Sequence, residues 1–352
     1  IFRDHASGLE HIRSCREIHE KGLFLELSAY KYYVFIDFRQ VVDDDQGIYE
    51  KLCSYLNGRG VPSVDEALRE LLLAPIQLPF EQIVNPGYFN YLLGFRLQKE
   101  QDALKNEVLI EARQKLNALL TAIEQYFAGE TEKGAILDET TTQLEHLLML
   151  DVLERVYPFP AGRIYSAALR YIKSGLASDE NWYVLLGWLF THRLGKMVSP
   201  MDYALQTQTW LDEWRLTKVL KNTFVSLIQD YEKAERSASI VRLLIGQQDW
   251  YSFASGKSLA EVVRNWLSDE TIRQFLGVNR YQDILWFNKE AYEEFIWWMM
   301  VIGTLEICVN PSLTATQFIE HVTALYNVIR RLLDAATVSD YQLNKLLSAI
   351  AG

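Results

Sequence analysis

Residues 279–298 bring aromatic, amide and acidic side chains together in a pattern that could recognise a carbohydrate. Tyr281 or Trp286 could stack on a sugar ring. Asn288 or Glu290 could form hydrogen bonds with its hydroxyl groups. The alternative is structural, with Asn288 capping a helix whose apolar positions face the core. Those positions are Tyr292, Phe295, Ile296 and Met299.

Two other aromatic clusters could also bind a glycan. Trp250 and Tyr251 form one such pair, and a second cluster contains Trp182, Tyr183 and Trp188. Aromatic residues at helical spacing usually pack in the core. We therefore expect both clusters to be structural, with Trp250 and Tyr251 kept as candidates for glycan binding.

His11, Cys15 and His19 follow one another at intervals of four residues, which would place them on one face of a helix. Imidazole and thiolate groups are typical zinc ligands. On a straight helix these residues span about 12 Å, too far to share an ion that lies about 2 Å from each ligand. Only a neighbouring pair could bind one, and we expect a polar helix face without metal.

The remaining charged and titratable positions have structural interpretations. Arg59, in the loop 56–62, could meet an anion, but its glycines are typical of a helix end and a turn. The run Asp43–Asp45 lacks the spacing and closing Glu of a calcium loop, which favours a solvated turn. The other histidines stand alone and indicate no chemistry: His146, His192 and His321.

Common catalytic and cofactor motifs are missing from the chain. It has no Gly-rich phosphate-binding loop, no His-Glu-x-x-His, no Cys-x-x-Cys and no Gly-x-Ser-x-Gly. We therefore expect no cofactor, no metal and no catalytic residue in this chain.

Composition limits the partners of the protein. The 352 residues carry 35 Lys and Arg against 46 Asp and Glu, a net charge of −11. This charge repels phosphate backbones, so nucleic acid is not an expected partner. No apolar run reaches the roughly 18 residues that span a bilayer, so no membrane partner is expected. Three widely spaced cysteines suit a reducing compartment, and we expect a cytoplasmic protein.

The N-terminal residues 1–45 predict a small antiparallel β element. In the strand predicted over 31–39, Tyr32, Val34, Ile36 and Phe38 alternate with the other residues and would share one face. Residues 22–27 would form its partner across a turn at Ser28–Ala29. Two strands alone are marginal, so the pair needs either a third strand at residues 1–3 or a helix across the Tyr32 face. Residues 8–20 predict a helix closed by Gly22. Because the strands do not recur and the chain opens on Ile1, we expect the end of a truncated β-sandwich.

Residues 46–352 predict a helical domain of about twelve helices. Four N-terminal capping boxes mark helix starts: Ser63 with Glu66, Ser258 with Glu261, Thr314 with Gln317, and Ser339 with Gln342. Ser199–Pro200 predicts a fifth start. Apolar spacing predicts one long helix over 210–231 and an amphipathic helix over 318–332. Loops are expected at 129–135, 158–162, 195–200 and 309–311, with a possible domain sub-boundary at 158–162. The fold class is thus a mainly α multi-helix array with a small N-terminal β element.

Several blocks of the sequence resemble the C-terminal helical region of large bacterial α-amylase-family proteins, glycoside hydrolase family 13. They keep their order over most of the chain and lie at 1–4, 8–14, 22–39, 56–63, 185–190, 210–214 and 279–298. The resemblance implies a parent with a catalytic (β/α)8 barrel, then a β-sandwich, then this region. The motifs that carry the family's catalytic carboxylates, Gly-x-Arg-x-Asp and Asn-His-Asp, are absent here.

Three interpretations of function remain open from the sequence. The resemblance favours a non-catalytic accessory region that braces the barrel of its parent chain, mediates self-association or binds α-glucan weakly, with the rest of the parent chain as partner. This interpretation predicts a bare apolar surface near residues 1–40. The second is a helical scaffold with a protein-binding groove. The third is an enzyme whose site would appear as convergent carboxylates of perturbed pKa in a pocket.

Overall fold

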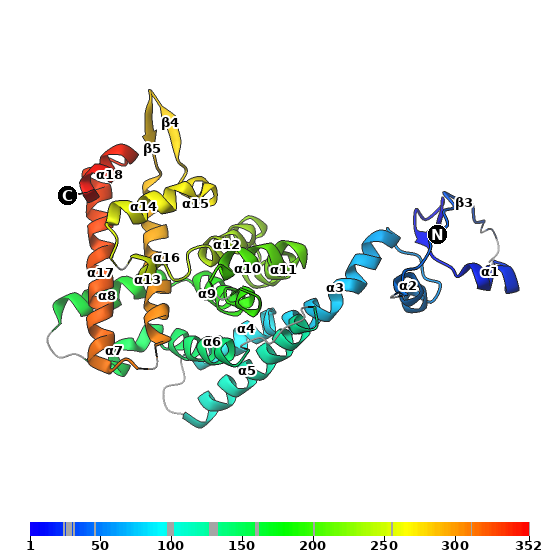
Figure 1. Cartoon of the computed structure of the whole chain (residues 1–352), viewed down its shortest axis with the longest axis horizontal. Coiled ribbons are helices and arrows are strands. Elements are labelled where there is room, and N and C mark those ends of the chain that lie inside the picture. The colour runs from blue at the N-terminus through cyan, green and yellow to red at the C-terminus, as the bar shows by residue number, and fades with distance from the viewer. Residues whose placement is uncertain are drawn as a thin grey trace. The chain divides into compact units, whose positions relative to one another are not determined.

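The protein is mainly α-helical, as the sequence predicts, with a small antiparallel sheet near its N-terminus (Figure 1). The computed structural model describes residues 1–23, 25, 30, 32–45, 47–96, 102–126, 133–158, 162–199, 201–254, 256–310 and 312–351. Within these ranges, fifteen α-helices have seven residues or more. The chain divides into two compact units, Ile1–Leu78 and Pro79–Gly352.

In its described residues the first unit combines three short strands with three helices. The strands are β1 (Phe2–Asp4), β2 (Glu10–His11) and β3 (Phe35–Ile36), in the order β2-β1-β3. The helices are α1 (Cys15–Lys21), α2 (Ile48–Leu56) and the first part of α3 (Val64–Ile83). Their small core contains Ile12, Leu52, Leu56 and Val64. Two prolines, Pro75 and Pro79, lie inside α3 near the boundary between the units, and each removes a backbone donor from the helix.

The second unit is built from helices and one hairpin. Its first half contains α4 (Pro86–Phe95), α5 (Asp102–Glu124), α6 (Lys133–Leu148), η1 (Leu150–Val152), α7 (Leu153–Val156), α8 (Arg163–Gly175), α9 (Asp179–Thr191) and η2 (Leu194–Met197). The second half contains α10 (Tyr203–Glu213), α11 (Leu216–Ile228), α12 (Tyr231–Ile245), α13 (Trp250–Ala254), α14 (Leu259–Ser268), α15 (Glu270–Phe275), β4 (Asn279–Tyr281), β5 (Ile284–Trp286), α16 (Lys289–Cys308), α17 (Ala315–Val338) and α18 (Leu343–Ala351).

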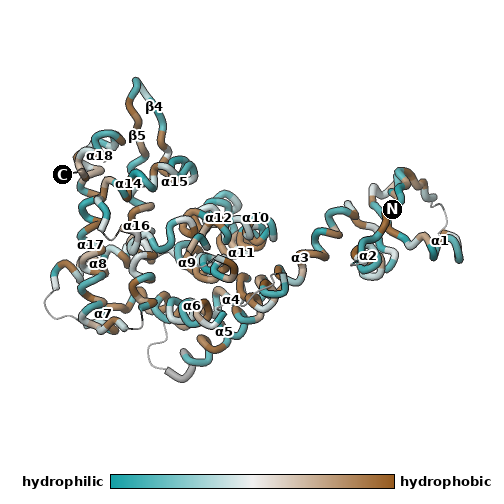
Figure 2. Tube along the Cα trace, viewed as in Figure 1, coloured by the Kyte–Doolittle hydropathy of each residue, from teal (hydrophilic) through white to brown (hydrophobic). Residues whose placement is uncertain are grey.

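Helix α16 is the centre of the second unit. Most of its side chains are buried all around the helix, which is typical of a core helix rather than a surface one. It packs against α6, α8, α13 and α17. Figure 2 shows hydrophobic and hydrophilic residues interleaved along the surrounding helices. The apolar run at 295–307 is therefore the sequence signal of the core of this unit.

The helix predicted over residues 8–20 is wrong in its first half, and the third strand predicted at residues 1–3 is confirmed as β1. Residues 10–11 form β2, which pairs with β1 and bridges to Val61. The Glu10 carboxylate accepts hydrogen bonds from Arg3 and from the Val64 backbone. These tertiary contacts outweigh helix propensity, so α1 begins only at Cys15. Gly22 closes α1 with a positive φ, as predicted.

The long strand predicted over residues 31–39 is wrong in extent. Of residues 32–39, which the structure describes, only Phe35–Ile36 enter the ladder, where they pair with β1. Asp37 has a φ of 54°, which interrupts the alternation in the manner of a β-bulge. Phe35 and Phe38 consequently both contact the Phe2 ring. The predicted turn at Ser28–Ala29 lies outside the described residues.

Three of the four capping-box positions begin helices as predicted. Ser258 and Thr314 form complete capping boxes, and the Glu66 backbone donates to the Ser63 hydroxyl. The fourth prediction is wrong, because Ser339 closes α17 and its hydroxyl donates back to the Ala336 carbonyl.

Two further helix predictions need correction. The predicted start at Ser199 is also wrong, because α10 begins at Tyr203. The single helix predicted over 210–231 is interrupted at Arg215 and Gln229, both in the left-handed region. The chain thus forms α10, α11 and the start of α12 instead.

Candidate functional sites

The β4–β5 hairpin brings together two of the predicted sugar-binding residues. Asn279 pairs with Trp286 and Tyr281 pairs with Ile284, so Tyr281 and Trp286 lie on the same face. Tyr281 is 64% exposed, whereas Trp286 is partly buried. The indole N–H of Trp286 is sealed from solvent without a hydrogen-bond partner in the structure. The hairpin projects beyond α14, α15 and α18 in Figure 1, and β5 contacts α18.

Asn288 and Glu290 lie beyond the hairpin, where the structural alternative holds. The Asn288 side chain accepts a hydrogen bond from the Ala291 backbone and caps α16. Glu290 is exposed in the first turn of that helix. The four positions expected to face the core are buried: Tyr292, Phe295, Ile296 and Met299.

The other aromatic candidates are largely part of the core. Trp182, Trp188 and Trp250 are each at most 3% exposed. The Trp250 indole donates to the Met299 carbonyl of α16, which fixes the ring. Tyr251 is partly exposed, and its hydroxyl donates to the His321 carbonyl at 3.4 Å. Trp250 is therefore not accessible for stacking on a ligand.

The histidine and cysteine positions are separated by the structure. His11 lies on β2 and stacks on Phe2, while Cys15 and His19 lie on α1. Within the described ranges, no three His, Cys, Asp or Glu residues are grouped to hold a metal ion. Asp43 accepts from the Tyr49 and Glu50 backbones at the start of α2, and Arg59 donates to carbonyls at its end. Asp43 and Arg59 therefore form hydrogen bonds with backbone groups at the two ends of α2.

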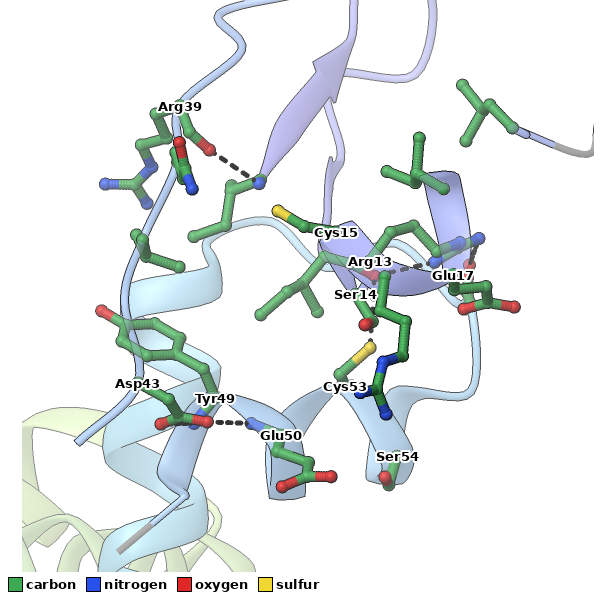
Figure 3. Close-up of a pocket in the computed structure, with 18 of the residues that line it drawn as sticks. Arg13, Ser14, Cys15, Glu17, Arg39, Asp43, Tyr49, Glu50, Cys53 and Ser54 are labelled. Atoms are coloured by element: carbon green, nitrogen blue, oxygen red, sulfur yellow. Dashed lines mark hydrogen bonds between the residues drawn. The ribbon is translucent and has the colours of Figure 1, made fainter. Parts of the chain in front are cut away.

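A cavity of 890 Å³ lies within the first unit (Figure 3). Its walls come from α1, α2 and the segment 39–43, and Cys15 and Cys53 both line it. Three of the seven charged side chains in its lining, Arg13, Arg39 and Asp43, have protein partners. Arg13 donates to the carbonyls of Ile12 and Gly58, and Arg39 pairs with Asp65. The lining therefore indicates no particular ligand.

A second cavity, of 410 Å³, lies among the helices of the second unit. It is lined by Tyr171, Ser174, Gly175, Asn181, Glu293, Glu294, Trp297, Leu333, Asp334 and Thr337. Three of these residues belong to the segment 279–298 that the sequence selects. The residues of that segment in the cavity are thus Glu293, Glu294 and Trp297, not the predicted Tyr281, Trp286, Asn288 and Glu290.

A buried charged network surrounds Arg193 in the second unit. Its guanidinium group donates to Glu139 at 2.7 Å, and Lys196 donates to the same carboxylate oxygen at 2.7 Å. Burial opposes ionisation of Glu139, but Lys196 and Arg193 hold its pKa below the usual value. A second nitrogen of Arg193 contacts Gln143 and the Nε2 atom of His192.

The neighbouring His192 is a neutral structural residue. Its Nδ1 atom lies 3.0 Å from the Trp188 carbonyl and must donate to it, so Nε2 accepts from Arg193. Burial, together with the Arg193 charge, places the pKa of His192 well below its ordinary value. The absence of chemistry expected for this residue is consistent with these contacts.

Two further carboxyl groups meet beside this network. The Tyr203 hydroxyl donates to Asp249, and Glu306 accepts from the Tyr251 backbone at 3.4 Å. The other Glu306 oxygen is sealed from solvent without a hydrogen-bond partner in the structure. Burial and the charge of Asp249 raise the pKa of Glu306 to about 8. Glu306 therefore remains protonated at neutral pH.

The sequence contained one signal for Glu306 but none for its partners. A single acidic residue inside the apolar run 295–307 must be buried if that run forms a core helix. Tyr203 and Asp249 lie far away in the chain and have no spacing that relates them to Glu306. None of these residues lines either of the two cavities described above.

No protein-family model, curated protein or solved structure matched the chain. No helix within the described ranges is long and apolar enough to cross a membrane.

Proposed function

We propose that this chain is a non-catalytic accessory region of an α-glucan-acting enzyme of the α-amylase type. Its N-terminal β element would pack against a β-sheet domain of the same polypeptide. The observation that carries this proposal is the apolar surface of the β element. Phe38 is 67% and Tyr33 is 41% exposed, and Tyr33 stacks on the partly buried Phe35. The ordered blocks that resemble the helical region of such enzymes support the same proposal.

The size of the β element explains why a sheet domain is the proposed partner. Its three strands contain two or three residues each, too few for a stable independent sheet. A second sheet packed on the aromatic residues Tyr33, Phe35 and Phe38 would bury surface that water now contacts. Polar replacements at these positions would therefore weaken attachment while leaving the helical unit folded.

The first test is the coding sequence upstream of Ile1, which should encode a barrel with an Asp nucleophile, a Glu acid and a second Asp. The longer protein should protect the amides of residues 32–38 from hydrogen exchange more strongly than this chain alone does. An upstream reading frame without such a barrel, or equal exchange in both proteins, would contradict the proposal.

The glucan-binding part of the proposal rests on the hairpin face that carries Tyr281 and Trp286. Isothermal titration with maltoheptaose should show weak binding, and Tyr281→Ala should abolish it. Tyr55→Ala is the control, because Tyr55 is equally exposed at 64% but lies in the first unit. A parallel assay on soluble starch should release no reducing ends; release by the purified chain would rule out a non-catalytic role.

A further inference from the structure

The cavity of 410 Å³ in the second unit has the size of a small-molecule site. Four helices meet around it. α8 contributes Tyr171, Ser174 and Gly175, and α9 contributes Asn181. α16 contributes Glu293, Glu294 and Trp297, and α17 contributes Leu333, Asp334 and Thr337. Because all ten residues lie on helices, the cavity walls are held by the core packing.

The cavity carries negative charge that its own lining does not neutralise. Three carboxylates line it, Glu293, Glu294 and Asp334, and among the residues that the structure describes no Lys, Arg or His does. Arg236 pairs with Glu294 from outside the lining, and Lys289 lies 3.9 Å from Glu293 on the same helix. Burial raises the pKa of the Tyr171 hydroxyl, and the charge of Glu293 raises it further.

Aromatic and apolar groups complete the walls. The Trp297 indole donates to the carbonyls of Tyr171 and Ile172, which fixes its ring between α8 and α16. Gly175 permits this position, because a Cβ atom there would lie 2.3 Å from the ring. Tyr171 and Leu333 add an aromatic and an aliphatic surface. Carboxylates beside fixed aromatic rings form the usual environment for an organic cation.

We propose that this cavity binds a small aliphatic amine of the diamine or polyamine class. Glu293 and Asp334 would accept hydrogen bonds from an ammonium group, and the aromatic and aliphatic walls would contact its methylene groups. A neutral sugar would bring no counter-charge for Asp334, the lining carboxylate for which the described residues show no ion pair. This site is independent of the accessory role proposed above and of the hairpin face that carries Tyr281.

The test is isothermal titration of the whole chain with spermidine at low and physiological ionic strength. The pocket variant is Glu293→Gln/Asp334→Asn, and the control variant is Glu290→Gln/Glu320→Gln. The four side chains are all exposed and lie on α16 or α17. Each double variant removes two negative charges. The pocket variant should weaken binding by at least about tenfold, because it removes two charged acceptors. The control variant should change affinity by less than about twofold, as expected for charges outside the cavity.

Three results would overturn this proposal. Equal weakening by both variants would show spermidine condensing on the acidic surface as a whole. No binding to the unmodified chain would exclude the site directly. Displacement of spermidine by maltoheptaose, lost in the pocket variant, would assign the cavity to a sugar. Thermal unfolding of both variants should match that of the unmodified chain, which separates loss of binding from loss of fold.

Discussion

Glu306 makes the stability of the second unit depend on pH in an unusual direction. In the unfolded chain its pKa has the ordinary value of 4.5, whereas burial and Asp249 raise it to about 8 in the fold. Between these two values the folded protein keeps a proton that the unfolded chain releases. Its contribution is therefore complete below about pH 4.5 and is lost as the pH rises to about 8.

Glu306→Gln should remove this dependence. Each pKa unit corresponds to about 1.4 kcal/mol, so the variant should be more stable than the unmodified protein by a few kcal/mol at pH 8. At pH 4.5 the two proteins should differ little. Urea unfolding measured from pH 4.5 to 8.5 checks this, with Glu320→Gln as the exposed control on α17. Parallel curves for Glu306→Gln and the unmodified protein would contradict the assignment.

Arg193 and Glu139 stabilise the fold as an ion pair, in contrast to Glu306, which is neutral in the folded protein. Glu139→Gln would remove the carboxylate that, among the described residues, pairs with both the buried Arg193 guanidinium and Lys196. Breaking such a pair typically costs about 3–5 kcal/mol when it is deeply buried. Because Glu139 is partly exposed, we expect about 2 kcal/mol, measured by urea unfolding at pH 7. Asp138→Asn, which breaks an exposed pair with Arg113, should cost far less.

Among the elements, the capping boxes show what local sequence can and cannot predict. Ser63, Ser258 and Thr314 were found because a cap and its partner lie within four residues. Ser339 has the same local pattern, yet it ends α17, because its buried hydroxyl donates a hydrogen bond to the Ala336 carbonyl. The breaks at Arg215 and Gln229 were missed for a related reason, since neither is the Gly or Asn that favours a left-handed conformation.

The candidate sites also show the difference between features that local sequence predicts and features that depend on tertiary packing. Asn288 and the buried face of α16 are local features and were predicted as the structural alternative. The cavity among α8, α9, α16 and α17 depends on the packing of helices that are far apart in the chain: the Trp297 indole, for example, donates to the Tyr171 carbonyl 126 residues away. No spacing within one segment could indicate it. The cavity residues from α16 belong to the segment 279–298, which the sequence marks as rich in aromatic and charged residues. Nothing in the sequence indicates that they line a cavity.

Gly175 tests the packing of α8 on α16. Gly175→Ala places a methyl group 2.3 Å from the Trp297 ring, so one of the two helices must shift. We expect a loss of about 1–3 kcal/mol in stability, the usual range for overpacking a core. Gly134→Ala is the control, because that glycine also lies in a helix and has nothing within 4 Å of the added atom. It should be neutral or stabilising by up to about 1 kcal/mol. Equal effects in urea unfolding would show that α8 and α16 are not tightly packed.

At the scale of the whole molecule, the two units should differ in stability. The first unit has a core centred on Ile12, Leu52, Leu56 and Val64, whereas the second is organised around the almost fully buried α16. Smaller cores bury a smaller fraction of apolar surface and open more readily. In hydrogen exchange followed by mass spectrometry, amides of β1, β2 and α2 should therefore exchange before those of α9 and α16. Pro79 near the boundary lies in α3, and the absence of its backbone donor favours separate opening of the two units. Simultaneous exchange of both sets across denaturant concentrations would show instead that the chain unfolds as one cooperative body.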